Sequence, residues 1–488
     1  MLMIVTFALN AGLNFALGLA VAAILGPDAF GRFALALIAA TLGTTVIFDW
    51  LRLSATRYYS ENARFDRPGL RASLDAGYVA GALVLAGAAG LVVALRIDIG
   101  MSGALVAAAA FAAIGNGLFE FAAALLRARF RTGAYGALVI VKNALAFLGM
   151  VAIGLAFHDP AGVLATAGAS ALLATLLLRR HAHDPHARLA QASREQVAAC
   201  LRYGAPIVAA NMCYQAILLV NRGAAAAHLD FAASGRLSLA TDLTIRFLLV
   251  AGAALDILLF QLAVHKKATE GAQAAQAQVA RNSLVILAAL TLLCSLYMAN
   301  LPAFAALVVP EKFRAEFAPL SLILAPGATL FCLGQFCLNP IAQLEGRTGL
   351  ILLAAFAAAL ADFGLLWLSP QPLGLAGFAA IHSIALTAGF LPMLALTLRW
   401  RACWPRPRDV VAILFAGAAA MAVMWPLREF EPRLPALAVG TLAGATVYAA
   451  LLFVFDPGGI ARPAFAKIRL WRRRDSSVPT PLCKGEPT

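Results

Sequence analysis

The sequence predicts an all-α polytopic membrane protein with about fourteen transmembrane helices. Of its 488 residues, 62% are hydrophobic and only 13% are charged, and the mean hydropathy is +0.84. Soluble domains are about half apolar and about a quarter charged, so a water-soluble fold could not bury this much apolar surface. The apolar runs are continuous and about 20 residues long, which is the length of a spanning helix. In the strands of a membrane barrel, apolar and polar residues instead alternate over about ten positions, so these runs are predicted to be helices.

Six predicted spans precede a basic connection, six follow it, and two more precede a basic tail. The spans are expected near 2–26, 33–51, 73–97, 101–126, 134–157, 161–178, 203–222, 236–264, 282–306, 319–341, 349–368, 375–398, 410–426 and 436–455. The expected divisions are six helices in 1–180, a cytoplasmic linker in 181–202, six helices in 203–400, two additional helices in 401–456 and a basic cytoplasmic tail in 457–488.

Lys and Arg, which give the chain a formal net charge of +14, gather in the connections after even-numbered spans and in the tail. Basic connections stay in the cytoplasm, so we expect both termini to be cytoplasmic. The charge therefore indicates membrane orientation and contact with anionic lipids, not nucleic acid. The opposite, outer connections are short, which weakens the hypothesis of a large external catalytic domain.

A short repeat indicates two related halves. Leu25–Ala36 reads LGPDAFGRFALA and Leu229–Ala240 reads LDFAASGRLSLA, and both copies place a Gly-Arg pair at the same position. A second echo, Arg-Thr-Gly, opens the fifth span at 131–133 and the eleventh at 347–349. Because six spans separate the copies, both halves enter the membrane in the same direction, as parallel repeats do.

Ionisable residues inside spans are the informative ones, because each costs at least about 2.5–3.5 kcal/mol at the bilayer centre. Arg246 lies ten residues beyond Arg236, hence about 15 Å deep, and its guanidinium is suited to phosphate oxygens. Asp242 is one turn earlier and could instead neutralise it. Asp256, deeper on the same helix, could balance Arg246 or carry a coupling proton.

Three charged residues lie near the cytoplasmic end of the second span. Asp49 and Arg52 are three residues apart, so they share a helix face and could pair. In the simplest interpretation, the long side chains of Arg52 and Arg57 extend to the membrane interface and Asp49 only pairs locally, so that none of the three has a role in function. The functional alternative places Arg52 or Arg57 at the inner mouth of a cavity, where it would meet an anionic headgroup.

The fourth and fifth spans carry a further pair of opposite charges. Glu120 and Lys142 lie inside antiparallel neighbours, so they could meet either as a structural ion pair or in a cavity.

The equivalent first spans of both halves carry a stripe of amides, Asn10 and Asn14 in one half and Asn211 and Gln215 in the other. Asn221 and Arg222 follow. Interhelical hydrogen bonds explain such stripes as readily as a sugar-lined cavity does, and their matched placement favours the cavity.

Signatures of nucleotide hydrolysis and of common hydrolases are missing: the chain contains no GxxxxGK[ST], GxSxG or HExxH pattern. The histidines at 181, 183 and 186 lie in a charged loop without a companion ligand arrangement. We therefore expect neither a cofactor nor a metal site.

The stretch LGPDAFGRFALALIAATLGTTVIFDWLRLSATRYYSE resembles the opening of polysaccharide-biosynthesis membrane proteins, the lipid-linked oligosaccharide flippases of the multidrug/oligosaccharidyl-lipid/polysaccharide exporter superfamily. Their first outer turn has a Gly-Pro-acidic-x-(Phe/Tyr)-Gly pattern, matched at 26–31, and their second span runs into an Arg-ending polar segment, matched at 52–57. Shorter matches are YGAP at 203–206, VPEKF at 309–313 and LEGR at 344–347. One departure is Asn221-Arg222, where the family often has Asp-Arg.

The resemblance implies two six-helix bundles around a central cavity, plus the two C-terminal helices, working by alternating access. The implied substrate is a polyprenyl-diphosphate-linked oligosaccharide for O-antigen, capsule or exopolysaccharide, with a polymerase and glycosyltransferases as pathway partners. On this hypothesis cationic side chains attract the diphosphate, amides contact sugar and buried acids serve coupling. The expected sets are Arg246, Arg222, Arg52 and Arg57 for the phosphate headgroup, Asn14, Asn211 and Gln215 for sugar, Lys142 as a further substrate-binding residue, and Asp256, Glu120 and Asp49 for coupling.

Two other functions stay open. A cation-coupled multidrug exporter of the same fold expects buried carboxylates for cationic drugs, and this interior holds about as many cations as acids. An integral membrane glycan polymerase or transferase expects a sizeable outer loop with catalytic residues, and the sequence has none.

Overall fold

The computed structural model describes residues 2–60, 68–185, 187–369, 372–428, 430–459 and 462, with the backbone alone at 2–11, 68, 251, 254, 257 and 258. The loop histidine at 186 and most of the predicted tail lie outside these residues. The α-helices are α1 Leu2–Tyr58, α3 Pro68–Ala94, α4 Gly103–Ala128, α5 Thr132–Phe157, α6 Pro160–Leu177, α7 Arg179–Ala182, α8 Arg194–His228, α9 Phe231–Thr269, α10 Ala272–Ala299, α11 Leu301–Val308, α12 Arg314–Leu333, α13 Asn339–Leu344, α14 Gly349–Leu368, α15 Leu375–Thr397, α16 Pro407–Met424 and α17 Arg433–Phe455.

The all-helical membrane architecture is confirmed. Within the described chain, 12 helical stretches are long and apolar enough to cross a bilayer. One of them, Gly12–Tyr58, contains the second predicted span and the latter part of the first, and the whole of α1 contains both. Helix α9 covers the predicted eighth span without being among the 12. The helices therefore correspond to the predicted set of about fourteen spans.

The Gly-Pro corner divides α1 into its two spans. Gly26 has φ 71° and ψ 175°, and the helix resumes at Pro27. A side chain at residue 26 would be strained in this left-handed region, whereas glycine adopts it freely. Proline in turn suits the first turn of the helix that follows, because its missing N–H has no partner there. The two residues thus change the direction of the chain without a loop.

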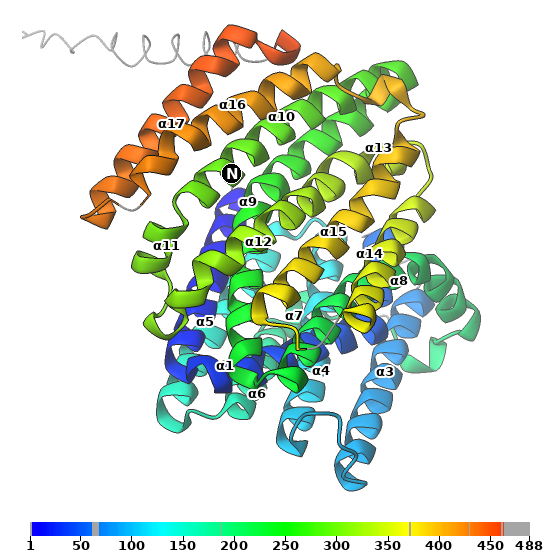
Figure 1. The fold of residues 1–488 in the computed structure, drawn as a ribbon. Helices are drawn as coiled ribbons and strands as arrows, with labels where there is room; N and C mark the ends of the chain where they lie inside the picture. Colours follow the sequence, from blue (N-terminus) through cyan, green and yellow to red (C-terminus); the bar gives the residue numbers. More distant parts are fainter. Residues whose placement is uncertain are drawn as a thin grey trace, which may run out of the picture. The chain divides into compact units, whose positions relative to one another are not determined.

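The chain forms two compact units. The first contains Met1–Ala254 and Leu301–Arg399, and the second contains Leu255–Asn300 and Trp400–Thr488. In the second unit α10, α16 and α17 pack side by side (Figure 1). Hydrogen bonds between helices join them: Tyr448 donates to the carbonyl of Ala288 at 2.7 Å and Ser295 to that of Gly417 at 2.9 Å. Hydroxyls buried in hydrocarbon need such partners.

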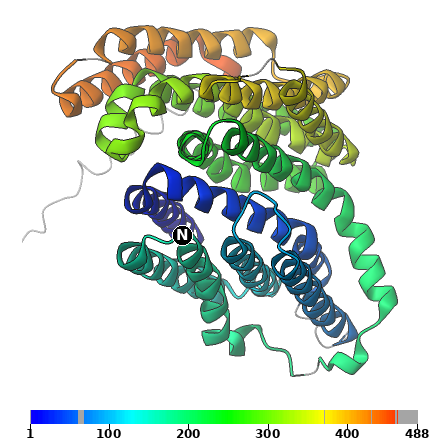
Figure 2. The ribbon, with the colours of Figure 1, turned by 60° about the horizontal axis from the view of Figure 1, so that its bottom comes forward.

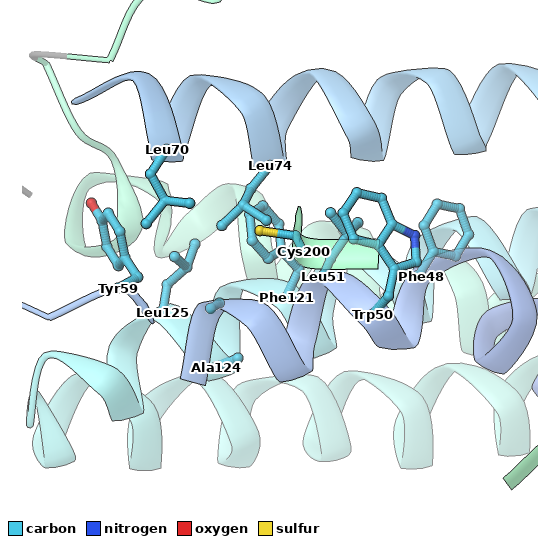
Figure 3. Packing of buried hydrophobic residues seen from close by; sticks show 11 residues of the cluster. Phe48, Trp50, Leu51, Tyr59, Leu70, Leu74, Phe121, Ala124, Leu125 and Cys200 are labelled. Carbon is cyan, nitrogen blue, oxygen red and sulfur yellow. The ribbon is translucent and has the colours of Figure 1, made fainter. Parts of the chain in front are cut away.

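In the first unit, α1, α3, α4, α5 and α6 lie together as a bundle, which Figure 2 shows in blue to teal. At one end of this bundle a cluster of large side chains packs between α1, α3 and α4 and reaches Cys200 at the start of α8 (Figure 3). Phe48, Leu51 and Leu74 in it are almost fully buried. Because lipid is as apolar as these side chains, close packing holds the cluster together more than water exclusion does.

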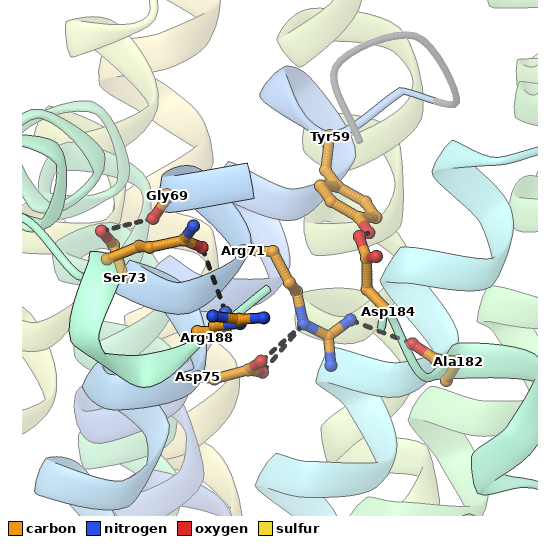
Figure 4. A network of polar contacts seen from close by, with 9 residues as sticks. Tyr59, Gly69, Arg71, Ser73, Asp75, Ala182, Asp184 and Arg188 are labelled. Atoms are coloured by element: carbon orange, nitrogen blue, oxygen red, sulfur yellow. Dashed lines mark hydrogen bonds and ion pairs between the residues drawn. The ribbon is translucent and has the colours of Figure 1, made fainter. Parts of the chain in front are cut away.

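The linker after α6 is bound to the same end of the bundle. Arg71 of α3 pairs with Asp75 at 2.8 Å and donates to the carbonyl of Ala182 at 3.1 Å, while Tyr59 donates to Asp184 at 2.7 Å (Figure 4). Burial and then the hydrogen bond to Asp184 raise the pKa of the Tyr59 phenol. The linker is therefore part of the packed structure.

A second group in the first unit is formed by α8, α12, α14 and α15, in which α14 packs against α8 and α15, and α15 packs against α12. The two copies of the repeat meet where α9 and the second half of α1 begin. A Cβ on Gly31 would lie 1.9 Å from the carbonyl oxygen of Phe231, and one on Gly235 would lie 2.2 Å from that of Pro27. Only glycine permits such a close helix crossing.

Candidate functional site

Arg246 is exposed on α9, and its contact is with α1. Its Nη1 donates a 3.1 Å hydrogen bond to the backbone carbonyl of Asn14, and Nη1 also lies beside Gly18. No carboxylate of the described residues forms an ion pair with it. A guanidinium bonded only to a carbonyl retains its charge and several free donors, so it can bind an anion.

The acid one turn before Arg246 is committed to a different arginine. Asp242 forms an ion pair with Arg222 of α8, whose side chain is almost fully buried. The hydroxyl of Ser234 donates to the Arg222 carbonyl at 2.9 Å, which ties α9 to α8. Arg222 is thus neutralised within the protein, while Arg246 is not.

A buried polar cluster lies beside this pair. Two of its members, Asp362 and His382, were not among the residues predicted from the sequence. Asn221 Nδ2 donates to Asp362 Oδ1 of α14 and to the carbonyl of Phe378 of α15, each at 3.4 Å. Asp362 is 0% exposed and His382 of α15 is 3% exposed. Both are ionisable groups inside apolar spans, the criterion that selected Arg246, and that criterion would have found them.

The predicted amides of α8 are half-buried. Asn211 and Gln215 lie one turn apart, and the Gln215 Oε1 atom is buried with no hydrogen-bond partner among the described residues. Asn14 contributes its backbone carbonyl to Arg246. An amide oxygen with a spare acceptor site suits a hydroxyl-rich ligand.

At the other end of α1 the predicted local pair is present. Arg52 Nε lies 3.2 Å from Asp49 Oδ1, and both side chains are largely covered. Arg57 is exposed and its guanidinium lies 4.5 Å from the ring centre of Tyr203 on α8. Among the described contacts, none joins this end of α1 to Arg246.

Among the described residues, Lys142 and Glu120 of the first bundle form no ion pair. The Lys142 ammonium lies 5.5 Å from the ring centre of Phe119 instead. Asp256 is half-buried on α9 and belongs to the second unit. The structure therefore brings some predicted residues together in pairs and leaves the others apart.

An apolar groove of about 760 Å³ lies between α1, α3 and α8. Leu35, Leu42, Leu85 and Leu219 contribute to its lining, which contains no charged residue. It can hold hydrocarbon but not a diphosphate. Within the described residues, no group of three or more His, Cys, Asp or Glu side chains is arranged to hold a metal.

No protein-family model matches the chain, and no curated protein matches it. Solved structures do. The structure titled lipid II flippase MurJ, inward closed conformation, has a TM-score of 0.70 at 11% identity, over 92% of this chain and 98% of that one.

Two structures of a multidrug resistance MATE family transporter of the MOP superfamily also match. The inward-facing one has a TM-score of 0.55 at 15% identity and the outward-facing one 0.53 at 16%, each over 82% of this chain and 94% of the other. At these identities the likeness shows the fold alone. The chain has the fold of MOP-superfamily membrane transporters.

Proposed function

We propose that the protein is a flippase that carries a polyprenyl-diphosphate-linked oligosaccharide across the bacterial inner membrane by alternating access, with both termini in the cytoplasm. Such a flippase would serve O-antigen, capsule or exopolysaccharide synthesis, beside glycosyltransferases and a polymerase. The fold supports this proposal, because a lipid II flippase shares it over almost the whole chain.

The observation that carries the proposal is the state of Arg246. Its sequence position is about 15 Å from Arg236 along the helix, and Asp242, the nearest candidate partner, is occupied by Arg222. A cation without a protein carboxylate at such a depth needs a compensating anion or water. A diphosphate supplies paired oxygens in the geometry that guanidinium binds best.

The other predicted residues have subordinate roles. Arg52 and Arg57 would meet the headgroup at the inner end, Lys142 would add positive potential, and Arg222 would hold Asp242 in the ion pair that leaves Arg246 without a carboxylate. The amides Asn14, Asn211 and Gln215 would bind sugar hydroxyls. Glu120, Asp49 and Asp256 stay candidates for coupling.

The test measures binding and export separately. Purified full-length protein is titrated with undecaprenyl diphosphate, and the same variants are assayed for surface glycan in a deletion strain. Loss of a charge-assisted hydrogen bond costs about 1.5–3 kcal/mol, so Arg246→Ala should bind roughly ten- to a hundredfold more weakly and Arg246→Lys should bind in between. The matched control is Arg236→Ala, which removes an arginine already paired with Glu316 at 3.1 Å. Unchanged binding and glycan in Arg246→Ala at normal expression would refute the assignment.

A cation-coupled multidrug exporter is the second candidate, and Asp362 favours it because an acid buried inside an apolar span is suited to coupling with a cation or proton. Normal surface glycan with increased drug sensitivity in the deletion strain would support the exporter over the flippase. A polymerase or transferase gains no support from the described residues, since the predicted outer turns between α5 and α6 and between α8 and α9 are only a few residues long.

A further inference from the structure

The cluster around Asp362 contains ionisable groups that the diphosphate hypothesis does not use. It joins four helices: Asn221 and Arg222 come from α8, Asp242 from α9, Asp362 from α14 and His382 from α15. Asp362 and Asn221 each lie about six or seven residues, hence roughly 10 Å, from the helix end on the predicted outer side. The cluster is therefore inside the bilayer, where ionisable groups are functional candidates by default.

The charges in the cluster do not balance if Asp362 is ionised. Arg222 and Asp242 neutralise each other. Asp362 receives one 3.4 Å hydrogen bond at Oδ1, from a neutral amide, and its Oδ2 has no partner among the described residues. An isolated buried carboxylate is far too costly and neutralises instead. In this conformation Asp362 is therefore stable as the neutral carboxylic acid.

Asn221 connects this acid to the helix that carries His382. Its amide nitrogen also donates to the carbonyl of Phe378, one turn before His382. The His382 Nε2 atom is buried without a partner among the described residues. Arg222 and Asp242 are the charged groups whose electrostatic influence reaches His382. The polar group that contacts Asp362 is the amide of Asn221. From α12, which packs against α15, the contact is neutral: Ser383 accepts from the backbone N–H of Gly327.

The arrangement fits a proton better than a metal ion. A hard cation needs several oxygen ligands converging on one point. Here the amide nitrogen of Asn221 stands between the two oxygens that could converge, Asp362 Oδ1 and the Phe378 carbonyl, and it points donors at both. A proton on Asp362 needs no further ligand.

We propose that Asp362 is the proton carrier of the transport cycle, and that His382, one turn past the Phe378 carbonyl that Asn221 contacts, takes up the proton when the cluster opens. This inference rests on the proposed transport function. When the cluster is closed, the proton occupies the Asp362 carboxyl. When water enters, the O–H bond breaks, the proton passes to water or to the His382 nitrogen, and the carboxylate is hydrated. Reprotonation from water on the other side returns the closed form.

The first experiment detects the protonated acid without any substrate. Full-length protein in vesicles of phosphatidylethanolamine and phosphatidylglycerol is titrated with pH in sodium-free choline buffer, and the infrared carbonyl band of protonated carboxylic acids is recorded. We expect the band at neutral pH in the wild type, its loss in the near-isosteric Asp362→Asn, and its retention in Glu316→Gln, which removes a partly exposed acid paired with Arg236. An absent wild-type band, or one that Asp362→Asn leaves unchanged, overturns the proposal.

The second experiment separates a proton from a metal ion. Thermal unfolding of the wild type is compared in sodium chloride and in choline chloride. Equal melting temperatures are expected. A sodium-dependent rise that Asp362→Asn abolishes would make the cluster a cation site and overturn the inference.

Transport itself supplies the last readout. Asp362→Asn should fail to restore surface glycan although undecaprenyl diphosphate still binds. Full restoration would remove the carrier role while leaving the flippase proposal intact. Loss of diphosphate binding in Arg246→Ala tests that proposal independently.

Discussion

The crossing of α1 and α9 at Gly31 and Gly235 yields a quantitative prediction about alternating access. A Cβ at residue 31 would lie 1.9 Å from the Phe231 carbonyl oxygen, whereas carbon–oxygen contacts are comfortable at about 3.3 Å or more. Gly31→Ala therefore requires the two helices to separate by roughly 1.4 Å. Overpacking of this kind destabilises the conformation in which the crossing is closed by about 1–3 kcal/mol. It does not destabilise a conformation in which the two helices have separated.

The expected result is a shift of about 5- to 150-fold toward the conformation open at the predicted outer side. Ser238, one turn past Gly235 on α9, is fully buried and reports the opening. The assay replaces the 7 native cysteines, introduces Ser238→Cys and measures its labelling rate by a membrane-impermeant maleimide in intact vesicles. Labelling should accelerate in Gly31→Ala.

The control is Gly87→Ala on α3, where a Cβ meets nothing within 4 Å, so labelling should match the wild type. The reasoning is refuted if Gly31→Ala is labelled no faster than this control and melts at the same temperature, because the added methyl group would then cause no steric clash at the crossing. Faster labelling with a monodisperse elution profile excludes simple unfolding.

Two further predictions concern polar contacts. Arg222→Ala leaves Asp242 without its cation. Breaking a buried pair costs about 3–5 kcal/mol, and the cost is smaller here because the Asp242 side chain is 29% exposed. The melting temperature should fall clearly in Arg222→Ala, and the double variant with Asp242→Ala should recover part of the lost stability. Because the pKa of Tyr59 is raised in the folded protein, the neutral phenol stabilises the fold. This contribution is fully present below the ordinary phenol pKa of about 10, and it is lost as the pH rises above that value. Tyr59→Phe should therefore weaken the linker contact at neutral pH yet flatten the alkaline loss of stability, measured as melting temperature against pH; identical alkaline slopes would contradict this.

Much of the architecture could be predicted because hydropathy over about 20 residues reports burial in lipid directly. The Gly-Pro corner at 26–27 was readable for the same local reason, since its backbone preference is intrinsic. Helix ends were less accessible: the second span was expected at 33–51, yet the helix continues to Tyr58. A hydropathy window registers where lipid ends, whereas a helix continues as long as its backbone bonds and packing persist.

The site was harder because its partners come from distant segments. Spacing correctly placed Asp49 and Arg52 together, since three residues apart means one helix face. The same rule offered Asp242 as partner for Arg246, but tertiary packing brings Arg222 of α8 to Asp242 instead. Nothing in the spacing of the residues on α9 indicates which arginine of another helix will arrive there. The Asp362 cluster likewise depends on α8, α14 and α15 meeting.

The glycine crossing also indicates how the closed end must open. Gly31 and Gly235 occupy the same position in the two copies of the repeat, and so do Pro27 and Phe231. Gly31 abuts the carbonyl of Phe231 while Gly235 abuts that of Pro27, which is the reciprocal pattern that a two-fold axis between the copies produces. Both contacts form and break together when the halves move as rigid bodies. Gly235→Ala should therefore accelerate Ser238→Cys labelling about as much as Gly31→Ala does. The double variant should add little, because the first Cβ has already parted the helices; full additivity of the two free energies would instead indicate two independent local movements.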